Sequence, residues 1–319
     1  MKRNLLLTLM LAFVVMLASA ANSGKKPTRL KAKAKASHVV LIGIDGWGAY
    51  SVTKAHDIPN IKYFMQNGCY TLKDRSVLPS ASAINWSSMF MGVPTEMHGY
   101  TTWGSRTPEI PSAYIGEHGM CPTIFTLIRE QMPGANTACF AEWDGIKYLV
   151  DTLSISHVEC PISSEKDLNT LSNRAADYIK ANKPAFIAIC NDQLDHTGHG
   201  EGHDTPAYYD CLARVDRQIG IIMQAVKDAG MWDNTIFILT ADHGGINKGH
   251  GGQTLQEMQI PFVICGKNVK SGMQINDCMM QYDCAATIAD IFGLQRPQSW
   301  RGVPAYSVFK HRLTVCPNN

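Results

Sequence analysis

Four short apolar runs alternate with amphipathic segments along the chain: 39–44 (VVLIGI), 184–190 (PAFIAIC), 235–240 (TIFILT) and 261–265 (PFVIC). A continuous apolar run of this length is typical of a strand that is covered on both faces. Helical patterns lie between the runs, most clearly at Glu165–Ala181, Pro206–Ala229 and Cys284–Phe292. The alternation predicts an α/β fold, a three-layer α/β/α sandwich around a mostly parallel central sheet.

Acidic residues and histidines follow three of these runs. Asp45 ends the first, the segment Asp195-His196-Thr197-Gly198-His199 follows the second, and Asp242-His243-Gly244-Gly245 follows the third, with His250 shortly after it. Each cluster alone could be a helix cap or an exposed loop. Together they lie at the carboxyl ends of parallel strands, the edge where such sheets bind ligands. Carboxylates and imidazoles are zinc ligands, so the pattern predicts a metal centre at this edge.

A third feature is the segment 79–100, which the pattern predicts to be a loop followed by a short helix from about Asn85 to Met91. Ser80 and Ser82 precede this helix, and a hydroxyl residue there is usually an N-cap. The free amide groups of a helix N-terminus also favour a bound phosphate. Both serines are therefore candidate caps and candidate nucleophiles.

The N-terminus has the three parts of a secretory signal peptide: two basic residues before position 4, an apolar stretch from Leu5 to Leu17, and Ala18-Ser19-Ala20. The apolar stretch is shorter than the ~20 residues that span a bilayer. We expect residues 1–20 to be cleaved and residues 21–37 to form a basic leader. The expected location is secreted or periplasmic, without stable membrane insertion.

Residues 38–319 are long enough for one catalytic domain. The region around 100–158 is the least regular and is the expected place for a small cap insert. The net charge of +2 gives no reason to expect binding to a nucleic-acid duplex. The ten cysteines of an exported chain favour a few disulfides beside some buried free thiols.

Taken in order, these motifs resemble the alkaline-phosphatase superfamily, and within it the nucleotide pyrophosphatase/phosphodiesterase group. The resemblance rests on VLIGIDG, on Ser82-x-x-Asn85-Trp86-Ser87-Ser88-Met89-x-x-Gly92 ending in His98-Gly99, on DHTGH with the later Val215-Asp216-x-x-Ile219-Gly220, and on TADHGG…GHGG. It covers nearly the whole mature chain. Two positions depart from the group, which usually has threonine at Ser82 and proline at Ile84, and this weakens the assignment of substrate class.

The resemblance implies two Zn²⁺ ions per chain. Asp195, His199 and His250 would hold one, and the other would be held by Asp45, Asp242, His243 and the oxygen of Ser82. It further implies that Ser82 attacks phosphorus to give a covalent phosphoseryl-type intermediate, and that Asn85 donates to a phosphate oxygen. Among the aromatic residues, Trp47 and Trp103 are expected to bind the organic group of the substrate.

The expected function is that of an exported zinc-dependent phosphodiesterase or nucleotide pyrophosphatase acting on a small-molecule phosphate ester, such as a nucleotide, lipid or sugar phosphate. One alternative is a phosphomonoesterase, which needs extra positive charge; Arg75 and Arg106 are the nearest arginines in sequence. A sulfatase is a second, but Ser82-Ala83-Ile84 lacks the proline of its C/S-x-P-x-R frame. A zinc protein without enzymatic activity is a third.

Overall fold

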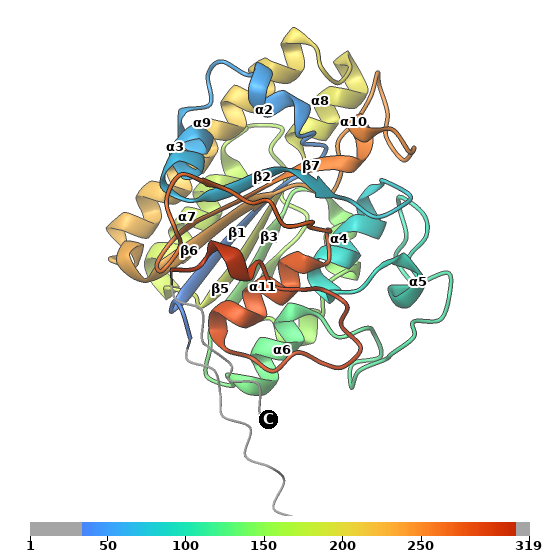
Figure 1. The fold of residues 1–319 in the computed structure, drawn as a ribbon, viewed down its shortest axis with the longest axis vertical. Coiled ribbons are helices and arrows are strands. Elements are labelled where there is room, and N and C mark those ends of the chain that lie inside the picture. The colour runs from blue at the N-terminus through green and yellow to red at the C-terminus, as the bar shows by residue number, and fades with distance from the viewer. Residues whose placement is uncertain (1–33, 311–319) are drawn as a thin grey trace, which may run out of the picture. The chain divides into compact units, whose positions relative to one another are not determined.

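The computed structural model describes residues 34–310, which are built around one eight-stranded sheet (Figure 1). The strand order is β4-β3-β5-β1-β6-β7-β2-β8. The strands are β1 His38–Ile44, β2 Cys69–Arg75, β3 Thr137–Ala141, β4 His157–Glu159, β5 Phe186–Asn191, β6 Thr235–Thr240, β7 Gln259–Gly266 and β8 Met273–Gln274. Three predicted strands are confirmed as β1, β5 and β6, which lie side by side and parallel in the middle of the sheet.

Helices cover both faces of the sheet, which confirms the predicted three layers (Figure 1). One face packs against α4 (Ser82–Met91), α6 (Ile124–Gln131) and α11 (Asp283–Phe292), and the other against α3 (Pro59–Asn67), α7 (Thr170–Asn182) and α9 (Pro206–Asp228). Alternate side chains of β1 enter the two cores, because successive residues of a strand point to opposite faces. The short elements are α2 Tyr50–Lys54, α5 Thr95–His98, α8 Gln193–Glu201, α10 Leu255–Met258 and the 3₁₀ turns η1 Asp144–Tyr148, η2 Thr152–Ser154, η3 Trp232–Asn234 and η4 Tyr306–Val308.

The fourth predicted strand, β7, runs antiparallel to both of its neighbours. The chain leaves β6 at the carboxyl edge and stays there through residues 241–258 before β7 begins. Consequently β7 ends at the opposite edge of the sheet. The end of β7 therefore contributes no acidic residue to the carboxyl edge. Its first residue is anchored at the carboxyl edge, where the Gln259 carbonyl accepts a hydrogen bond from the Ala49 amide, 2.9 Å away.

Much of the region 100–158, where we expected an insert, belongs to the domain itself. β3 lies inside the sheet between β4 and β5, and α6 contributes buried residues to one core. The longest stretch of this region without a helix or strand is residues 100–123. The pattern missed β3 because its sequence, TACFA, is short and contains small residues.

The predicted signal peptide lies outside the described residues, as does most of the basic leader. The last residues of that leader pack against the domain, where Lys35 forms an ion pair with Asp290 at 2.9 Å. Within residues 34–310 the nine cysteines are free thiols, so the expected disulfides are not found among them. None of the helices in this range combines the length and the apolarity that crossing a bilayer requires.

Helix α4 is fixed to the central strand by Trp86. The indole ring lies on Gly43 of β1, where an added Cβ would come within 2.3 Å of it. The indole N–H donates to Asp45 Oδ2 at 3.1 Å. Any larger residue at position 43 would therefore push α4 away from the end of β1.

Helix α3 is fixed to α9 by Asp216, a residue of the sequence motif on the long helix. Its buried carboxylate accepts hydrogen bonds from the backbone amides of Asn60 at 3.0 Å and Ile61 at 2.7 Å. Gly220, one turn later, lets Asn60 pack against the helix. This part of the motif is therefore structural: it caps the first turn of α3 from outside.

We predict that Asp216→Ala lowers the free energy of unfolding by about 2–3 kcal/mol, because it leaves buried amides of α3 without an acceptor. Denaturant unfolding monitored by circular dichroism measures the change. Asp210→Ala, at an exposed position of the same helix, is the control and should change the stability by less than about 0.5 kcal/mol. Equal effects of the two substitutions would contradict the capping role.

Candidate active site

Three aspartates meet at the carboxyl edge of the sheet. Asp45 directly follows β1, Asp242 lies two residues beyond β6, and Asp195 is in the first turn of α8, just after β5. The ends of the strands are level, because Gly43 of β1 is opposite both Cys190 and Thr240. All three carboxylates are buried. The structure thus contains the predicted convergence of acidic residues at the carboxyl ends of the strands.

Three histidines face the same space with the same hydrogen-bonding pattern at Nδ1. In each, Nδ1 lies next to a backbone carbonyl oxygen: His199 at 3.0 Å from Lys248 O, His243 at 2.8 Å from Gly244 O, and His250 at 3.2 Å from Ser80 O. A carbonyl can only accept, so Nδ1 carries a proton in each ring. In the neutral imidazole Nε2 then has a free lone pair, which is how metal-binding histidines are usually held.

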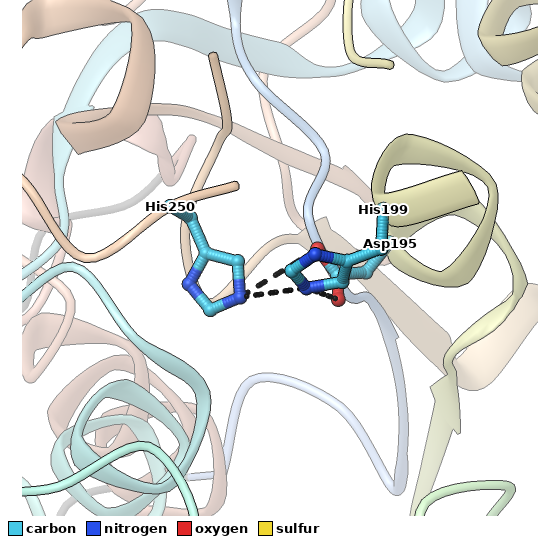
Figure 2. A group of neighbouring side chains, drawn as sticks. All are labelled: Asp195, His199 and His250. Carbon is cyan, nitrogen blue, oxygen red and sulfur yellow. Dashed lines mark hydrogen bonds and ion pairs between the residues drawn. The ribbon is translucent and has the colours of Figure 1, made fainter. Parts of the chain in front are cut away.

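The first group consists of Asp195, His199 and His250 (Figure 2). His199 Nε2 lies 3.2 Å from Asp195 Oδ2 and 3.2 Å from His250 Nε2. Two neutral imidazoles cannot present lone pairs to one another at that distance without repulsion. A proton or a metal cation between them is required, and the three side chains offer one ligand atom each within 4.8 Å.

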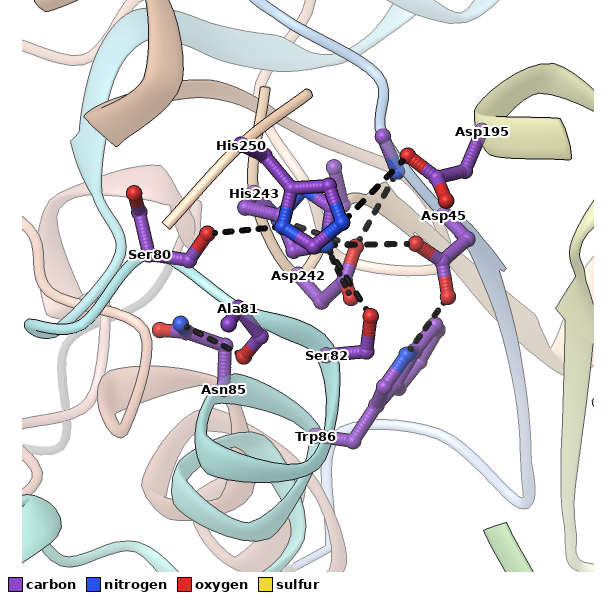
Figure 3. Close-up of polar contacts among 12 residues, drawn as sticks. Asp45, Ser80, Ala81, Ser82, Asn85, Trp86, Asp195, Asp242, His243 and His250 are labelled. Atoms are coloured by element: carbon purple, nitrogen blue, oxygen red, sulfur yellow. Dashed lines mark hydrogen bonds and ion pairs between the residues drawn. The ribbon is translucent and has the colours of Figure 1, made fainter. Parts of the chain in front are cut away.

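The second group lies beside the first around His243 (Figure 3). His243 Nε2 is 3.4 Å from Asp45 Oδ1 and 3.2 Å from Asp242 Oδ2. Asp45, Asp195 and His243 offer ligand atoms within 4.8 Å of one another. Asp195 thus offers a ligand atom to both groups, whereas the resemblance assigned it to the first group alone.

The acidic groups fit a pair of cations. Asp45 Oδ2 accepts from Trp86, and Asp242 Oδ1 accepts from the amides of Gly46 at 3.2 Å and His243 at 2.9 Å. The other oxygen of each, together with Asp195 Oδ1, is buried without a hydrogen-bond partner. A buried carboxylate oxygen without a donor is costly unless a cation is bound to it. One oxygen of Asp45 and one of Asp242 are thus held in place by protein donors, while the other oxygen of each remains available to a metal.

Burial and mutual repulsion shift the pKa values of the carboxyl groups at this centre. Burial, followed by the charges of Asp242 and Asp195, raises the pKa of Asp45 well above its usual range. Burial and the charge of Asp195 raise the pKa of Asp242 to about 7. Burial acts in the same direction on Asp195, but the bond from His199 and the neighbouring imidazoles hold its pKa below the usual value. That bond in turn raises the pKa of His199 to about 9.

The two candidate serines are separated clearly by the structure. α4 begins at Ser82 and its N-cap is Ala81, so neither serine caps the helix. Ser82 Oγ lies 3.1 Å from His243 Nε2, inside the second group. Ser80 Oγ instead donates to the carbonyl of Gly252 at 2.7 Å. Only Ser82 has its hydroxyl at the candidate metal centre (Figure 3).

Asn85, expected to donate to a phosphate oxygen, does not face the centre. Its Oδ1 accepts from the Val77 amide at 2.7 Å, and its Nδ2 lies 3.1 Å from the Pro79 carbonyl. Nδ2 is also 3.1 Å from the Ala81 carbonyl (Figure 3). The side chain is fully buried. Its amide is already bound to the loop before Ser82, so in this structure Asn85 orders that loop and has no free donor for a ligand.

The two tryptophans expected to bind substrate differ in their exposure to solvent. Trp47 is fully buried in the core, so that expectation is wrong. Trp103 is 68% exposed and lines a cleft of about 610 Å³ beside the candidate metal centre. The other lining residues are Pro79, Ala81, Ile84, Thr101, Thr102, His199, Gly249, His250 and Gly251.

The backbone beside Trp103 is connected to the helix of the candidate nucleophile. The Trp103 carbonyl accepts from the Ala83 amide in the first turn of α4, at 3.1 Å. Glu109 orders the loop by accepting from the Thr101 amide at 2.7 Å and from Ser105 Oγ at 2.6 Å. The cleft wall and Ser82 thus belong to one hydrogen-bonded unit.

His203 is a residue near the centre to which the sequence pattern assigns no role in metal binding. It is buried, and its Nε2 lies 3.8 Å from Asp195 Oδ1. Burial lowers its pKa to about 4, so it is neutral at pH 7. Its place after Gly202, beyond the DHTGH segment, gives no periodic signal that would have identified it.

Comparison with known proteins agrees with this geometry. The sequence model of the type I phosphodiesterase/nucleotide pyrophosphatase family matches residues 39–248. The chain is 25% identical over 220 residues to bis(5'-adenosyl)-triphosphatase enpp4 of Mus musculus, covering 66% of this chain and 47% of that protein. It therefore spans about half the length of that curated relative.

Solved structures share the fold at low sequence identity. An inactive murine ectonucleotide pyrophosphatase/phosphodiesterase 5 in complex with AMP superposes with a TM-score of 0.66 and 15% identity, covering 82% of this chain and 96% of that one. A 2-O GAG sulfatase superposes with a TM-score of 0.68 and 15% identity, covering 84% and 73%. The family match covers well over half of the sequence. This chain belongs to the type I phosphodiesterase/nucleotide pyrophosphatase family of the alkaline-phosphatase superfamily.

Proposed function

We propose that this protein hydrolyses phosphate diesters or pyrophosphates at a centre for two zinc ions, with Ser82 as nucleophile. The observation that carries the proposal is the Ser82 hydroxyl, 3.1 Å from His243 Nε2 within six converging aspartates and histidines. Zinc bound by these residues would neutralise charge on the phosphate and lower the pKa of the serine hydroxyl. The ligands are Asp45, Asp195, His199, Asp242, His243 and His250.

The role of each protein group follows from its position. Ser82, at the first turn of α4, attacks phosphorus, and the ester bond to the leaving group breaks as the Ser82 Oγ–phosphorus bond forms. Water then hydrolyses the phosphoseryl-type ester and returns the hydroxyl. Phosphoryl transfer needs mainly positioning and charge stabilisation, and both can come from this buried centre and the N-terminus of α4.

The cleft beside the centre supports a diester over a monoester. No lysine or arginine is among the residues that line it. Arg106 pairs with Asp144 at 3.5 Å, and Lys248 donates to the Gly200 carbonyl at 2.6 Å. A monoester dianion would find no additional cation there, whereas a second organic group would meet the indole of Trp103. AMP in the murine structure named above is consistent with a nucleotide as that group.

Export is part of the same proposal. It rests on the N-terminal charge and apolar pattern, with cleavage after residue 20 and a secreted or periplasmic product. The substrate would then be a small extracellular or periplasmic phosphate ester.

The direct test compares three substrates with and without a chelator: bis-p-nitrophenyl phosphate, p-nitrophenyl phosphate and p-nitrophenyl sulfate. We expect the diester to be the best substrate and the chelator to abolish turnover. Faster hydrolysis of the sulfate would reject the proposal in favour of a sulfatase. Absence of turnover from a protein that binds zinc would favour the non-enzymatic alternative.

Replacement of the nucleophile is the first specific prediction. Ser82→Ala should lower kcat on the diester by at least about 10³-fold, because no other hydroxyl replaces the attacking group. Zinc content, measured by mass spectrometry, should remain near that of the parent, because the aspartates and histidines are unchanged. Ser80→Ala is the matched control and should cost less than about tenfold; a larger loss there than at Ser82 would reassign the nucleophile.

The wall of the cleft generates a second prediction. Trp103→Ala should raise KM for the aromatic diester by about tenfold while changing kcat less, because the indole contacts only the organic group. Trp103→Phe should retain most of the binding. Ile115→Ala, exposed on the same segment but outside the cleft, is the control. An unchanged KM in Trp103→Ala would remove this residue from the substrate site.

The pH dependence of metal binding is a third. Asp242, with a pKa of about 7, and His199, with a pKa of about 9, hold protons in the metal-free protein. A cation must displace these protons, so zinc affinity should rise with pH, by up to about tenfold per pH unit for each proton released. Calorimetric titration between about pH 6 and pH 9 measures this. A constant affinity would contradict the ligand assignment.

A further inference from the structure

The His203 ring lies between the two segments that carry most of the metal ligands. On one side it contacts Gly198 of α8, where an added Cβ would lie 2.4 Å from the ring, and on the other Gly245, where the distance would be 2.3 Å. Gly198 lies between Asp195 and His199, and Gly245 is two residues after His243. The two glycines leave the space that the imidazole fills, so the ring sets the separation of α8 from the 242–250 loop.

The backbone of His203 holds the same loop. Its amide donates to the Asn247 carbonyl at 2.6 Å, and its ring stacks at a tilt on Tyr208 of α9, with centroids 5.4 Å apart. The side chain is 0% exposed. Its position is therefore determined from four sides, and it has little freedom to move.

The two ring nitrogens of His203 make no hydrogen bond to another described residue. Among the same residues, Asp195 Oδ1 has no hydrogen-bond partner either. Nε2 and Oδ1 face each other at 3.8 Å. The other two acidic ligands each have a protein donor on one oxygen: Trp86 for Asp45, and the Gly46 amide for Asp242. Asp195 Oδ1 has no such donor within hydrogen-bond distance, and His203 Nε2 lies 3.8 Å from it.

We propose that His203 is the positioning residue of Asp195: its ring keeps the two ligand-bearing segments apart, and its Nε2–H is presented to Asp195 Oδ1. A neutral imidazole carries one N–H, and in the Nε2 tautomer this N–H points toward the carboxylate. Donors of this kind orient acidic ligands, and their loss typically costs metal affinity. The inference rests on the metal centre of the proposed function and concerns how that centre is held.

Two features distinguish this role from simple core packing. An apolar side chain of similar size would fill the space between Gly198 and Gly245 equally well and would avoid burying two unpaired nitrogens. An imidazole at this place is costly unless a polar group uses it. Asp195 is also the carboxylate shared by the two candidate metal groups, so its orientation affects both.

The test measures Zn²⁺ binding to the chelator-treated full chain and three variants, with competition against a chromophoric chelator. His203→Leu keeps the volume but has no donor, His203→Gln places an N–H at the reach of Nε2, and His203→Asn has a donor that is too short. We expect Leu and Asn to lower zinc affinity by about 10–100-fold and Gln to stay within about threefold of the parent. His98→Leu, which removes another buried histidine away from the metal centre, controls for general destabilisation.

The visible spectrum of the Co²⁺-loaded protein is a second readout, because it reports ligand geometry without any activity measurement. It should change in His203→Leu and His203→Asn and be restored in His203→Gln. Equal zinc affinity and equal Co²⁺ spectra in all folded variants would overturn the positioning role. If His203→Leu fails to fold, the comparison of Gln with Asn decides. A parent protein that binds no zinc would instead reject the proposed function itself.

Discussion

The rest of the structure depends on three carboxylates crowded into one buried space. Two unit negative charges 4.8 Å apart repel by about 3–4 kcal/mol at an effective dielectric of 20, and this centre contains three aspartates. Asp45 and Asp242 respond with raised pKa values, which is the response of the protein without a cation. Bound divalent ions would relieve that repulsion and occupy the carboxylate oxygens that have no donor. This repulsion in the metal-free protein would thus favour the binding of a divalent cation.

The sheet topology makes this crowding unavoidable. Neighbouring parallel strands end at the same level, so residues that follow β1, β5 and β6 must meet whatever their separation in sequence. Trp86 places the candidate nucleophile at the same edge, because its ring lies on Gly43 and its N–H binds Asp45. The hydroxyl of Ser82, one turn earlier on α4, is thereby placed beside His243. The position of Ser82 follows from packing on the central strand, and Ser82 does not cap the helix.

The sequence alone was sufficient for the central strands and the convergence of the ligands, because continuous apolar runs and the acidic residues after them are local signals. The sequence was insufficient where the role of a residue depends on the direction in which its side chain points. Trp47 and Trp103 have the same side chain, yet one lies in the core and the other in the cleft, and no periodic pattern distinguishes them. Asn85 was expected to bind phosphate, but its amide is bound by the loop before Ser82. β3 was not predicted because its five residues include small ones and do not form the continuous β-branched run that identified the other strands.

Charge balance finally links the centre to the class of substrate. Before Ser82 loses its proton, two divalent cations among three ionised aspartates would leave one net positive charge, and the three histidines add none when they are neutral ligands. A diester monoanion matches that charge. A monoester dianion exceeds it by one, and among the residues of the cleft no arginine or lysine supplies the difference. The absence of lysine and arginine from the cleft wall and the exposed indole of Trp103 therefore both support the proposed preference for a diester.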